Sequence, residues 1–184
     1  MGKQTDRQSA STRNHKKGGK FFPALCGAAG TLAILSVIAL LLPMTLPRLF
    51  GFEVYDVVSG SMSPAIPQGS LVVVRPVSWR EIEDGDVIAF ESEGSVVTHR
   101  VTQIREEEGQ FITKGDANAA NDIRGVSFLE LIGRVELHIP FLGDLSAMAA
   151  GRTGKLRLGC LLLGGILLRM LGERGKKADR EVEG

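Results

Sequence analysis

Cysteine is scarce in this chain of 184 residues, which contains two. Cys26 and Cys160 both lie in strongly apolar stretches, and the polar middle of the chain has no cysteine, so a disulfide framework is not expected. A free cysteine in such a stretch usually behaves as a small apolar side chain. We therefore expect both residues to lie in lipid-facing or packed helices.

The chain also lacks an excess of charge of either sign. It carries 22 basic and 21 acidic residues, for a formal net charge of +1. Proteins that bind nucleic acids usually concentrate positive charge, so no nucleic-acid partner is expected. Aromatic residues are few, with one Trp, one Tyr and eight Phe against 23 Gly. This composition favours an aliphatic core built from short strands and tight turns.

Charge is absent from one stretch near the N-terminus, residues 21–42. About 20 apolar residues in a helix suffice to cross a bilayer, so we predict a transmembrane helix over 21–46. Pro43, Pro47 and Arg48 follow the apolar run where a cleaved leader would have small residues, so an uncleaved anchor is expected. Residues 1–20 are polar and basic, which predicts a disordered segment on the cytoplasmic side.

Short β-branched runs separated by Gly, Pro and acidic turns fill residues 47–145 and predict a β domain outside the membrane. Five runs are strand candidates, and this number and spacing suggest a compact barrel or coiled sheet, hence a mainly β fold. The candidates are residues 71–74, 86–90, 96–104, 110–114 and 132–139.

The C-terminal apolar run has two interpretations. Residues 156–171 are apolar but contain Arg157 and Arg169. We expect a second membrane helix here, with both arginines extending to the interfaces, and the alternative is an amphipathic helix lying in the interface. Residues 146–155 would then be a linker and 172–184 a charged tail.

Three segments hold candidate catalytic residues, and each has an ordinary structural explanation. The sequence Ser-Gly-Ser-Met-Ser-Pro from Ser59 to Pro64 is typical of a turn. His99 shares one face of an alternating strand with apolar neighbours, where a lone histidine is usually a core residue. Residues 113–122 are rich in Asp and Asn, which commonly form Asx-turns; the spacing of a calcium loop is missing, so no metal site is expected.

Taken together, the three segments resemble type I signal peptidases from Val57 to about Leu145. In that family the Ser-Gly-Ser-Met-x-Pro box holds the nucleophile, here Ser61, and a later box holds the base beside Arg-Val, here His99. The segments Gly85 to Phe90 and Lys114 to Asp116 are similar to two further boxes in the same order. Histidine as the base places the resemblance with the archaeal and endoplasmic-reticulum Ser-His-Asp subtype.

The resemblance also implies the remaining site residues. The third member of the triad falls on Asp122, with Asp116 as the alternative acid. The Ser61 backbone N–H and the Ser59 hydroxyl would stabilise the oxyanion. Met62 is a candidate for lining the substrate groove, although core packing explains an apolar residue there equally well.

The expected mechanism is attack by Ser61 on a peptide carbonyl, with His99 accepting the serine proton and Asp122 orienting the imidazole. By resemblance, the substrates are pre-proteins whose signal peptides end in small residues, as in A-x-A, and no cofactor is needed. We expect a plasma-membrane protein with its catalytic domain on the extracytoplasmic side, in contact with the lipid bilayer and compatible with membrane partner subunits. Two alternatives stay open: a dedicated maturation protease for a single partner, and a non-catalytic membrane-anchored β module.

Overall fold

The computed structural model describes residues 21–183, so the segment 1–20 that we expected to be disordered and basic lies outside the described part. The chain divides into two compact units. One contains residues up to Ile34 together with Leu162–Gly184, and the other comprises Leu35–Leu161.

Helix α1 (Phe21–Leu49) begins at the first residue of the uncharged run and continues past both prolines, Pro43 and Pro47. It therefore ends three residues later than we expected. Within the described residues, Phe22–Leu49 is the single stretch of helix long and apolar enough to cross a membrane, with a mean hydropathy of 2.4 over its most apolar window. The Thr45 hydroxyl donates a hydrogen bond to the Leu41 carbonyl (2.9 Å) in the turn between the prolines.

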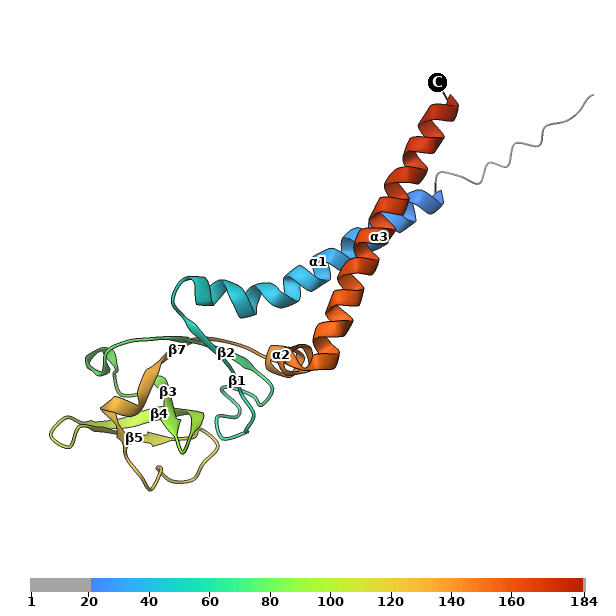
Figure 1. Ribbon diagram of the computed structural model, residues 1–184. Helices are drawn as coiled ribbons and strands as arrows, with labels where there is room; N and C mark the ends of the chain where they lie inside the picture. Colours follow the sequence, from blue (N-terminus) through green and yellow to red (C-terminus); the bar gives the residue numbers. More distant parts are fainter. Residues whose placement is uncertain (1–20, 184) are drawn as a thin grey trace, which may run out of the picture. The chain divides into compact units, whose positions relative to one another are not determined.

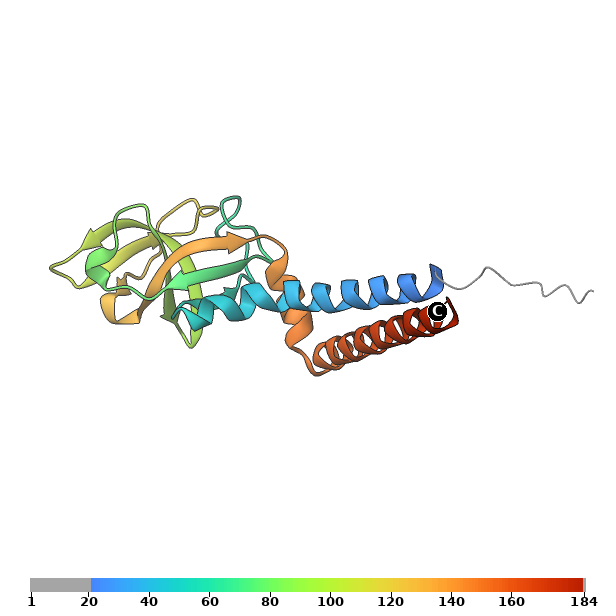
Figure 2. The same ribbon diagram turned by 90° about the horizontal axis from the view of Figure 1, so that it is seen from above.

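The β domain is one seven-stranded antiparallel sheet with the order β1-β2-β7-β3-β4-β5-β6 (Figures 1 and 2). This confirms a mainly β fold. The strands are β1 (Glu53–Asp56), β2 (Leu71–Arg75), β3 (Val87–Ser92), β4 (Ser95–Arg105), β5 (Gln110–Lys114), β6 (Val126–Ser127) and β7 (Leu131–Ile139), with short 3-10 helices η1 (Trp79–Glu81) and η2 (Phe128–Glu130).

All five strands expected from the sequence are present, with ends that differ by no more than two residues. The two missed strands are the edges of the sheet. Strand β1 is four residues long and has charged residues at both ends, and β6 has two residues, so neither contains a periodic apolar run. Their extended conformation depends on pairing with β2 and β5, which a local pattern does not reveal.

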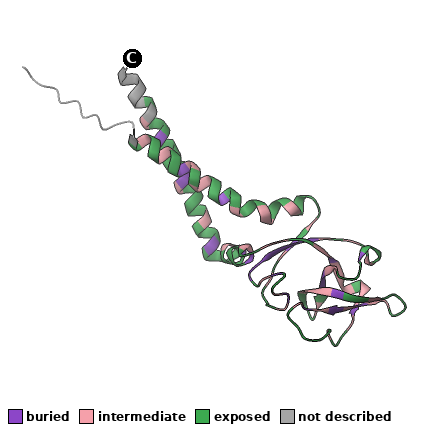
Figure 3. Ribbon diagram, turned by 180° about the vertical axis from the view of Figure 1, so that it is seen from behind, coloured by how far each residue is buried: buried purple, intermediate pink, exposed green. Residues whose placement is uncertain are grey.

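Two apolar clusters form the core, one on each face of β3. Ile88 and Phe90 belong to the cluster that includes Phe111, whereas Ala89 belongs to the cluster that includes Met62. Register shifts interrupt three of the strand pairings, and such bulges bend and twist a sheet. Figure 3 shows the buried residues concentrated in the β domain, while most residues of the long helices are exposed.

The segment 146–155, expected to be a linker, is largely helical: α2 (Leu142–Ala150) occupies its first half and α3 (Arg152–Glu183) begins within it. Helix α2 depends on contacts that are distant in sequence. The backbone N–H groups of Gly143 and Asp144 donate to the Gly69 carbonyl, and the Ser146 hydroxyl donates to Asp56. The charged tail expected from residue 172 is a continuation of α3.

In the other unit, the first part of α1 and the last part of α3 pack backbone against backbone. A Cβ atom added to Gly30 would lie 2.7 Å from the Arg169 backbone nitrogen, and one added to Gly172 would lie 2.6 Å from the Pro23 carbonyl oxygen. The two helices lie side by side here in both views (Figures 1 and 2). Glycine is therefore required for this close approach.

Candidate active site

Ser61 lies in a loop of residues 58–69 that connects β1 to β2 and is closed at its base. The Val57 N–H donates to the Ser70 carbonyl and the Gly69 N–H donates to the Val57 carbonyl, both at 2.8 Å. Gly69 has a φ of +81°, a left-handed conformation that favours glycine. These contacts hold a loop with no regular secondary structure in one conformation.

Inside this loop, Met62 is 1% exposed and packs in the second core cluster with Ile66. Its side chain therefore anchors the loop in the core and offers no surface to a ligand in this conformation, which favours core packing over a groove-lining role. Ser59 is exposed, and its Oγ lies 3.2 Å from the Ser61 Oγ, within hydrogen-bond distance. The two hydroxyls expected to act together thus lie next to each other, with Ser59 exposed and Ser61 partly buried.

His99 lies in the middle of β4, opposite Ile88 of β3. It points to the same face as the buried Val101, as the alternation in the sequence predicted, and its ring meets Phe90 edge to face with centroids 6.2 Å apart. The His99 Nδ1 lies 2.5 Å from the Asp122 Oδ2. This contact leaves the other ring nitrogen, Nε2, as the atom that can accept a proton from a nucleophile.

Thr113 is a further member of the site that the sequence did not reveal. It is completely buried, and its Oγ1 donates a 2.7 Å hydrogen bond to the same Asp122 oxygen that contacts His99. The Asp122 N–H also donates to the Thr113 carbonyl at 2.8 Å. Threonine in an alternating strand resembles any other β-branched residue, so the sequence carries no signal for this role.

The other acid, Asp116, contacts Arg100. Its two carboxylate oxygens accept hydrogen bonds from Nε and Nη2 of Arg100, at 2.8 and 2.7 Å. The hydrogen bonds from Arg100 hold the pKa of Asp116 below its ordinary value, and the same pairing raises the pKa of Arg100. The structure thus brings Asp122, and not Asp116, within hydrogen-bond distance of His99.

The loop between these two acids contacts both the serine segment and the histidine strand. The Ala117 N–H donates to the Ser61 carbonyl at 2.8 Å, five residues before Asp122 contacts His99. A Cβ atom on Gly115 would lie 2.7 Å from that carbonyl oxygen, so only glycine permits this approach. Ile123, which follows Asp122, is fully exposed and takes no part in the core.

The Ser61 hydroxyl and the His99 ring form no direct hydrogen bond between them in the described part of the chain; the loop of residues 115–122 contacts both the serine loop and His99. A cavity of about 250 Å³ borders the histidine and its acid. Phe90 and Val97 line its apolar side and Arg124 its polar side. Catalytic hydrogen bonds are often long without substrate and shorten when it binds.

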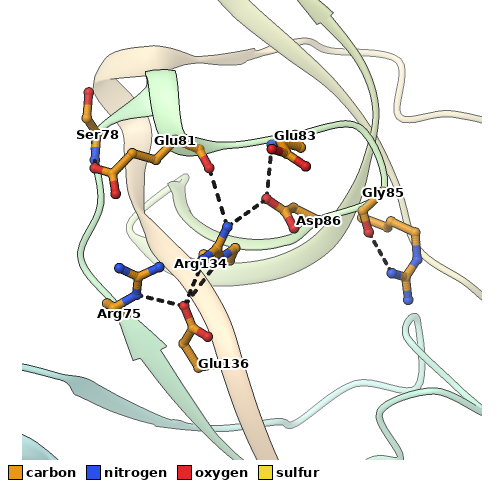
Figure 4. Close-up of polar contacts among 9 residues, drawn as sticks. Arg75, Ser78, Glu81, Glu83, Gly85, Asp86, Arg134 and Glu136 are labelled. Carbon is orange, nitrogen blue, oxygen red and sulfur yellow. Dashed lines mark hydrogen bonds and ion pairs between the residues drawn. The ribbon is translucent and has the colours of Figure 1, made fainter.

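A network of charged side chains supports the strands behind the site (Figure 4). Arg134 of β7 contacts Asp86 at 3.3 Å and Glu136 at 3.2 Å, and Glu136 also accepts from Arg75 at 2.7 Å. Asp86 follows Gly85, whose carbonyl accepts a 2.8 Å hydrogen bond from Arg100. The network therefore holds the turn at Gly85 in place, and this turn binds Arg100, the residue next to His99.

Comparison with known proteins finds similarity over the part of the chain that contains these residues. The model of the Peptidase S24-like family matches residues 51–136, which include every residue of the site described above. Signal peptidase I W of Bacillus subtilis is 41% identical over 85 residues, which are 44% of this chain and 45% of that protein. Part of the chain is thus similar to a type I signal peptidase.

Eukaryotic proteins are among the similar sequences as well. The human signal peptidase complex catalytic subunit SEC11C is 32% identical over 99 residues, 47% of this chain and 52% of that protein. The corresponding SEC11 subunit of Metarhizium acridum is 33% identical over 104 residues, 50% of this chain and 60% of that protein. The chain thus spans about half the length of the curated relatives it matches.

Proposed function

We propose that this protein is a membrane-bound serine endopeptidase that removes N-terminal signal peptides from secreted pre-proteins, cutting after small residues. The observation that carries the proposal is the His99–Asp122 contact, together with the loop that joins this pair to the backbone of Ser61. A buried threonine that orients the acid, and two serine hydroxyls within hydrogen-bond distance of each other, are consistent with an active site and exceed what a turn requires.

In this mechanism Ser61 attacks the carbonyl carbon of the scissile peptide bond, and its proton passes to Nε2 of His99. Serine is a weak nucleophile at neutral pH, so this proton transfer is needed for attack. Asp122 holds the ring with Nδ1–H directed at its carboxylate and stabilises the imidazolium that forms. The imidazolium then donates the proton to the leaving amine, and water releases the signal peptide from Ser61 by the same steps.

The oxyanion of the tetrahedral intermediate needs hydrogen-bond donors. We assign the Ser61 backbone N–H as the first and the Ser59 hydroxyl as the second, because the two serine Oγ atoms are 3.2 Å apart. Removing one donor of this kind typically lowers the rate about 10²- to 10³-fold. Strand β1, which leads to these serines, is an edge strand, so its free backbone groups can pair with an extended substrate.

Substrate and enzyme would meet at the outer surface of the plasma membrane. The apolar helix α1 supports an anchor, and the basic residues before it favour a cytoplasmic N-terminus. The close packing of α3 against α1 through Gly30 and Gly172 supports α3 as a second membrane helix. Human SEC11C is a catalytic subunit of a signal peptidase complex, and by analogy with it membrane partner subunits are proposed here.

The decisive experiment measures cleavage of a model pre-protein by the full-length protein in detergent. We expect Ser61→Ala and His99→Ala to abolish cleavage, whereas Ser95→Ala, at an exposed serine at the start of β4, serves as the matched control and should cleave normally. Wild-type rates in the Ser61→Ala variant would overturn the mechanism. Cleavage of one co-purified partner, with no activity on general pre-proteins, would instead indicate a dedicated maturation protease.

The membrane topology needs its own test. A protease-sensitive tag placed after Gly184 should be protected in sealed right-side-out vesicles if α3 crosses the membrane. Digestion of the tag from outside would indicate that α3 lies along the surface. Neither result depends on catalytic activity.

A further inference from the structure

A second cavity, of about 450 Å³, lies within the unit formed by residues 35–161 and shares no lining residue with the cavity beside His99. Its walls come from the last part of α1, strands β1 and β2, helix α2 and the start of α3. Pockets of this size lined mainly by apolar side chains, with a few polar groups, are typical of small-molecule sites. The catalytic mechanism does not use this cavity.

Two long helices, α1 and α3, border the cavity, and each contributes one cation and at least one apolar residue farther from the β domain in sequence. On α1, Leu41 and Met44 are followed by Arg48, and on α3, Lys155 is followed by Leu158. These spacings of three and four residues place the members of each set on one helix face. Both cations are therefore at the helix ends that adjoin the β domain in sequence, and the apolar residues lie one or two turns farther along the helices.

Among the residues that the structure describes, the two cations have no acidic partner in an ion pair. In the described part of the chain, neither Arg48 nor Lys155 forms an ion pair with a carboxylate. Asp56 also lines the cavity, but its carboxylate accepts a hydrogen bond from the Ser146 hydroxyl. Counting these three charged groups, the cavity has a net charge of +1 and two free donors for an anion.

We propose that this cavity binds an anionic phospholipid, with the phosphate between Arg48 and Lys155 and an acyl chain along Leu41, Met44 and Leu158. A guanidinium can contact a phosphate through two parallel hydrogen bonds, and the ammonium adds a second charge. The cavity continues from an apolar helix able to cross a membrane to a pair of cations, which is the polarity profile of a lipid at the bilayer surface. The proposal rests on the membrane anchoring proposed above but is independent of the peptidase activity.

The test compares lipids that remain bound to the full-length protein. The protein is reconstituted in nanodiscs of equal parts phosphatidylcholine and phosphatidylglycerol and then released into detergent, and the co-purifying lipids are counted by native mass spectrometry. We expect phosphatidylglycerol to be enriched over its share of the bilayer. In Arg48→Gln/Lys155→Gln the enrichment should fall, by about fivefold for each cation removed.

A matched double variant, Arg80→Gln/Arg105→Gln, removes two exposed cations elsewhere on the β domain and should keep the enrichment. An equal loss in this control would overturn the proposal, since general surface charge would then explain the binding. Ala149→Trp, which fills the cavity from α2, should also release the lipid. If inorganic phosphate at matched ionic strength displaces the lipid, the acyl chain has no role and the proposal is wrong.

Two further measurements separate this inference from the proposed function. The Ser61→Ala protein should bind phosphatidylglycerol as the wild type does, so loss of catalysis leaves the lipid result interpretable. The Arg48→Gln/Lys155→Gln variant should still cleave a model pre-protein in detergent, which shows that it is folded. Displacement of the lipid by a synthetic signal peptide would assign the cavity to the substrate and overturn the lipid site.

Discussion

Asp122 Oδ2 lies 2.5 Å from His99 Nδ1 and 2.7 Å from the hydroxyl of the buried Thr113. One carboxylate oxygen thus faces a histidine on β4 and a threonine on β5, two neighbouring strands paired with each other. The position of the acid is therefore set by the sheet, although the acid itself lies in a loop. This arrangement distinguishes it from Asp116, which is six residues earlier and contacts Arg100.

The two acids should respond differently to the same substitution. We expect Asp122→Asn to lower kcat on the order of 10³- to 10⁴-fold, because an amide no longer fixes the tautomer of His99 or stabilises its cation. Asp116→Asn should lower stability by about 1 kcal/mol, through the weakened contact with the partly exposed Arg100, and should change kcat much less. Steady-state cleavage of a model pre-protein measures both. A larger loss in Asp116→Asn would move the catalytic role to that residue.

Gly115→Ala should impair both folding and catalysis. The added Cβ atom would lie 2.7 Å from the Ser61 carbonyl oxygen, so either the serine loop or the loop after β5 must shift. We expect a loss of about 1–3 kcal/mol in the free energy of unfolding and at least a tenfold lower kcat/KM. Gly151→Ala is the control, because a Cβ atom there meets nothing within 4 Å. Equal behaviour of the two variants would contradict this prediction.

Acidification should destabilise the β domain partly through Asp116. The hydrogen bonds from Arg100 lower the pKa of this carboxyl in the folded protein below its ordinary 3.8. A group with a lowered folded pKa stabilises the protein above its unfolded pKa, and the contribution is lost as the pH falls through the folded value. Between about pH 5 and 7, which is roughly one unit or more above the unfolded pKa, the contribution of Asp116 to the free energy of unfolding should be constant. Below about pH 4 this contribution should decline.

The measurement is unfolding by urea, followed by the fluorescence of Trp79, at a series of pH values. Trp79 is the single tryptophan of the chain and stacks on Phe128 with ring centroids 4.3 Å apart, so its emission reports on the β domain. Asp116→Asn should remove part of the acid decline. An unchanged decline in this variant would show that other carboxyls account for it.

Tyr55 should ionise at unusually high pH. Burial in β1 and then the hydrogen bond to Glu53 raise the pKa of its phenol from 10.0 to about 12. Because this residue is the only tyrosine, the rise of phenolate absorbance near 295 nm with pH reports on it alone. Stability from this group is present below the unfolded pKa of about 10 and is lost as the pH rises towards the folded value.

Glu53→Gln should lower the midpoint of this titration but leave it above 10, because burial remains after the carboxylate is removed. The urea-unfolded protein is the reference and should titrate at about 10. A folded protein that titrates there as well would show that Tyr55 is neither buried nor bonded to Glu53 in solution.

Several features followed from the sequence because they depend on local properties. The absence of charge after Phe21 predicted the apolar helix, and alternation placed His99 on the face of β4 that carries Val101. Edge strands and α2 were missed because their stability comes from partners far along the chain, such as the Gly69 carbonyl that binds the start of α2. We predicted a linker at residues 146–155 because the local sequence gives no sign of that contact.

The sequence by itself determined the chemical types at the site: two serines in a tight loop, a histidine on an apolar strand face and two acids in the segment after β5. Only the tertiary structure decided which acid faces the histidine, that Met62 anchors the serine loop, and that Thr113 completes the acid's hydrogen bonds. The physical reason is that strand alternation is a property of neighbouring residues, whereas hydrogen bonds between loops and strands depend on distances that only the folded sheet sets.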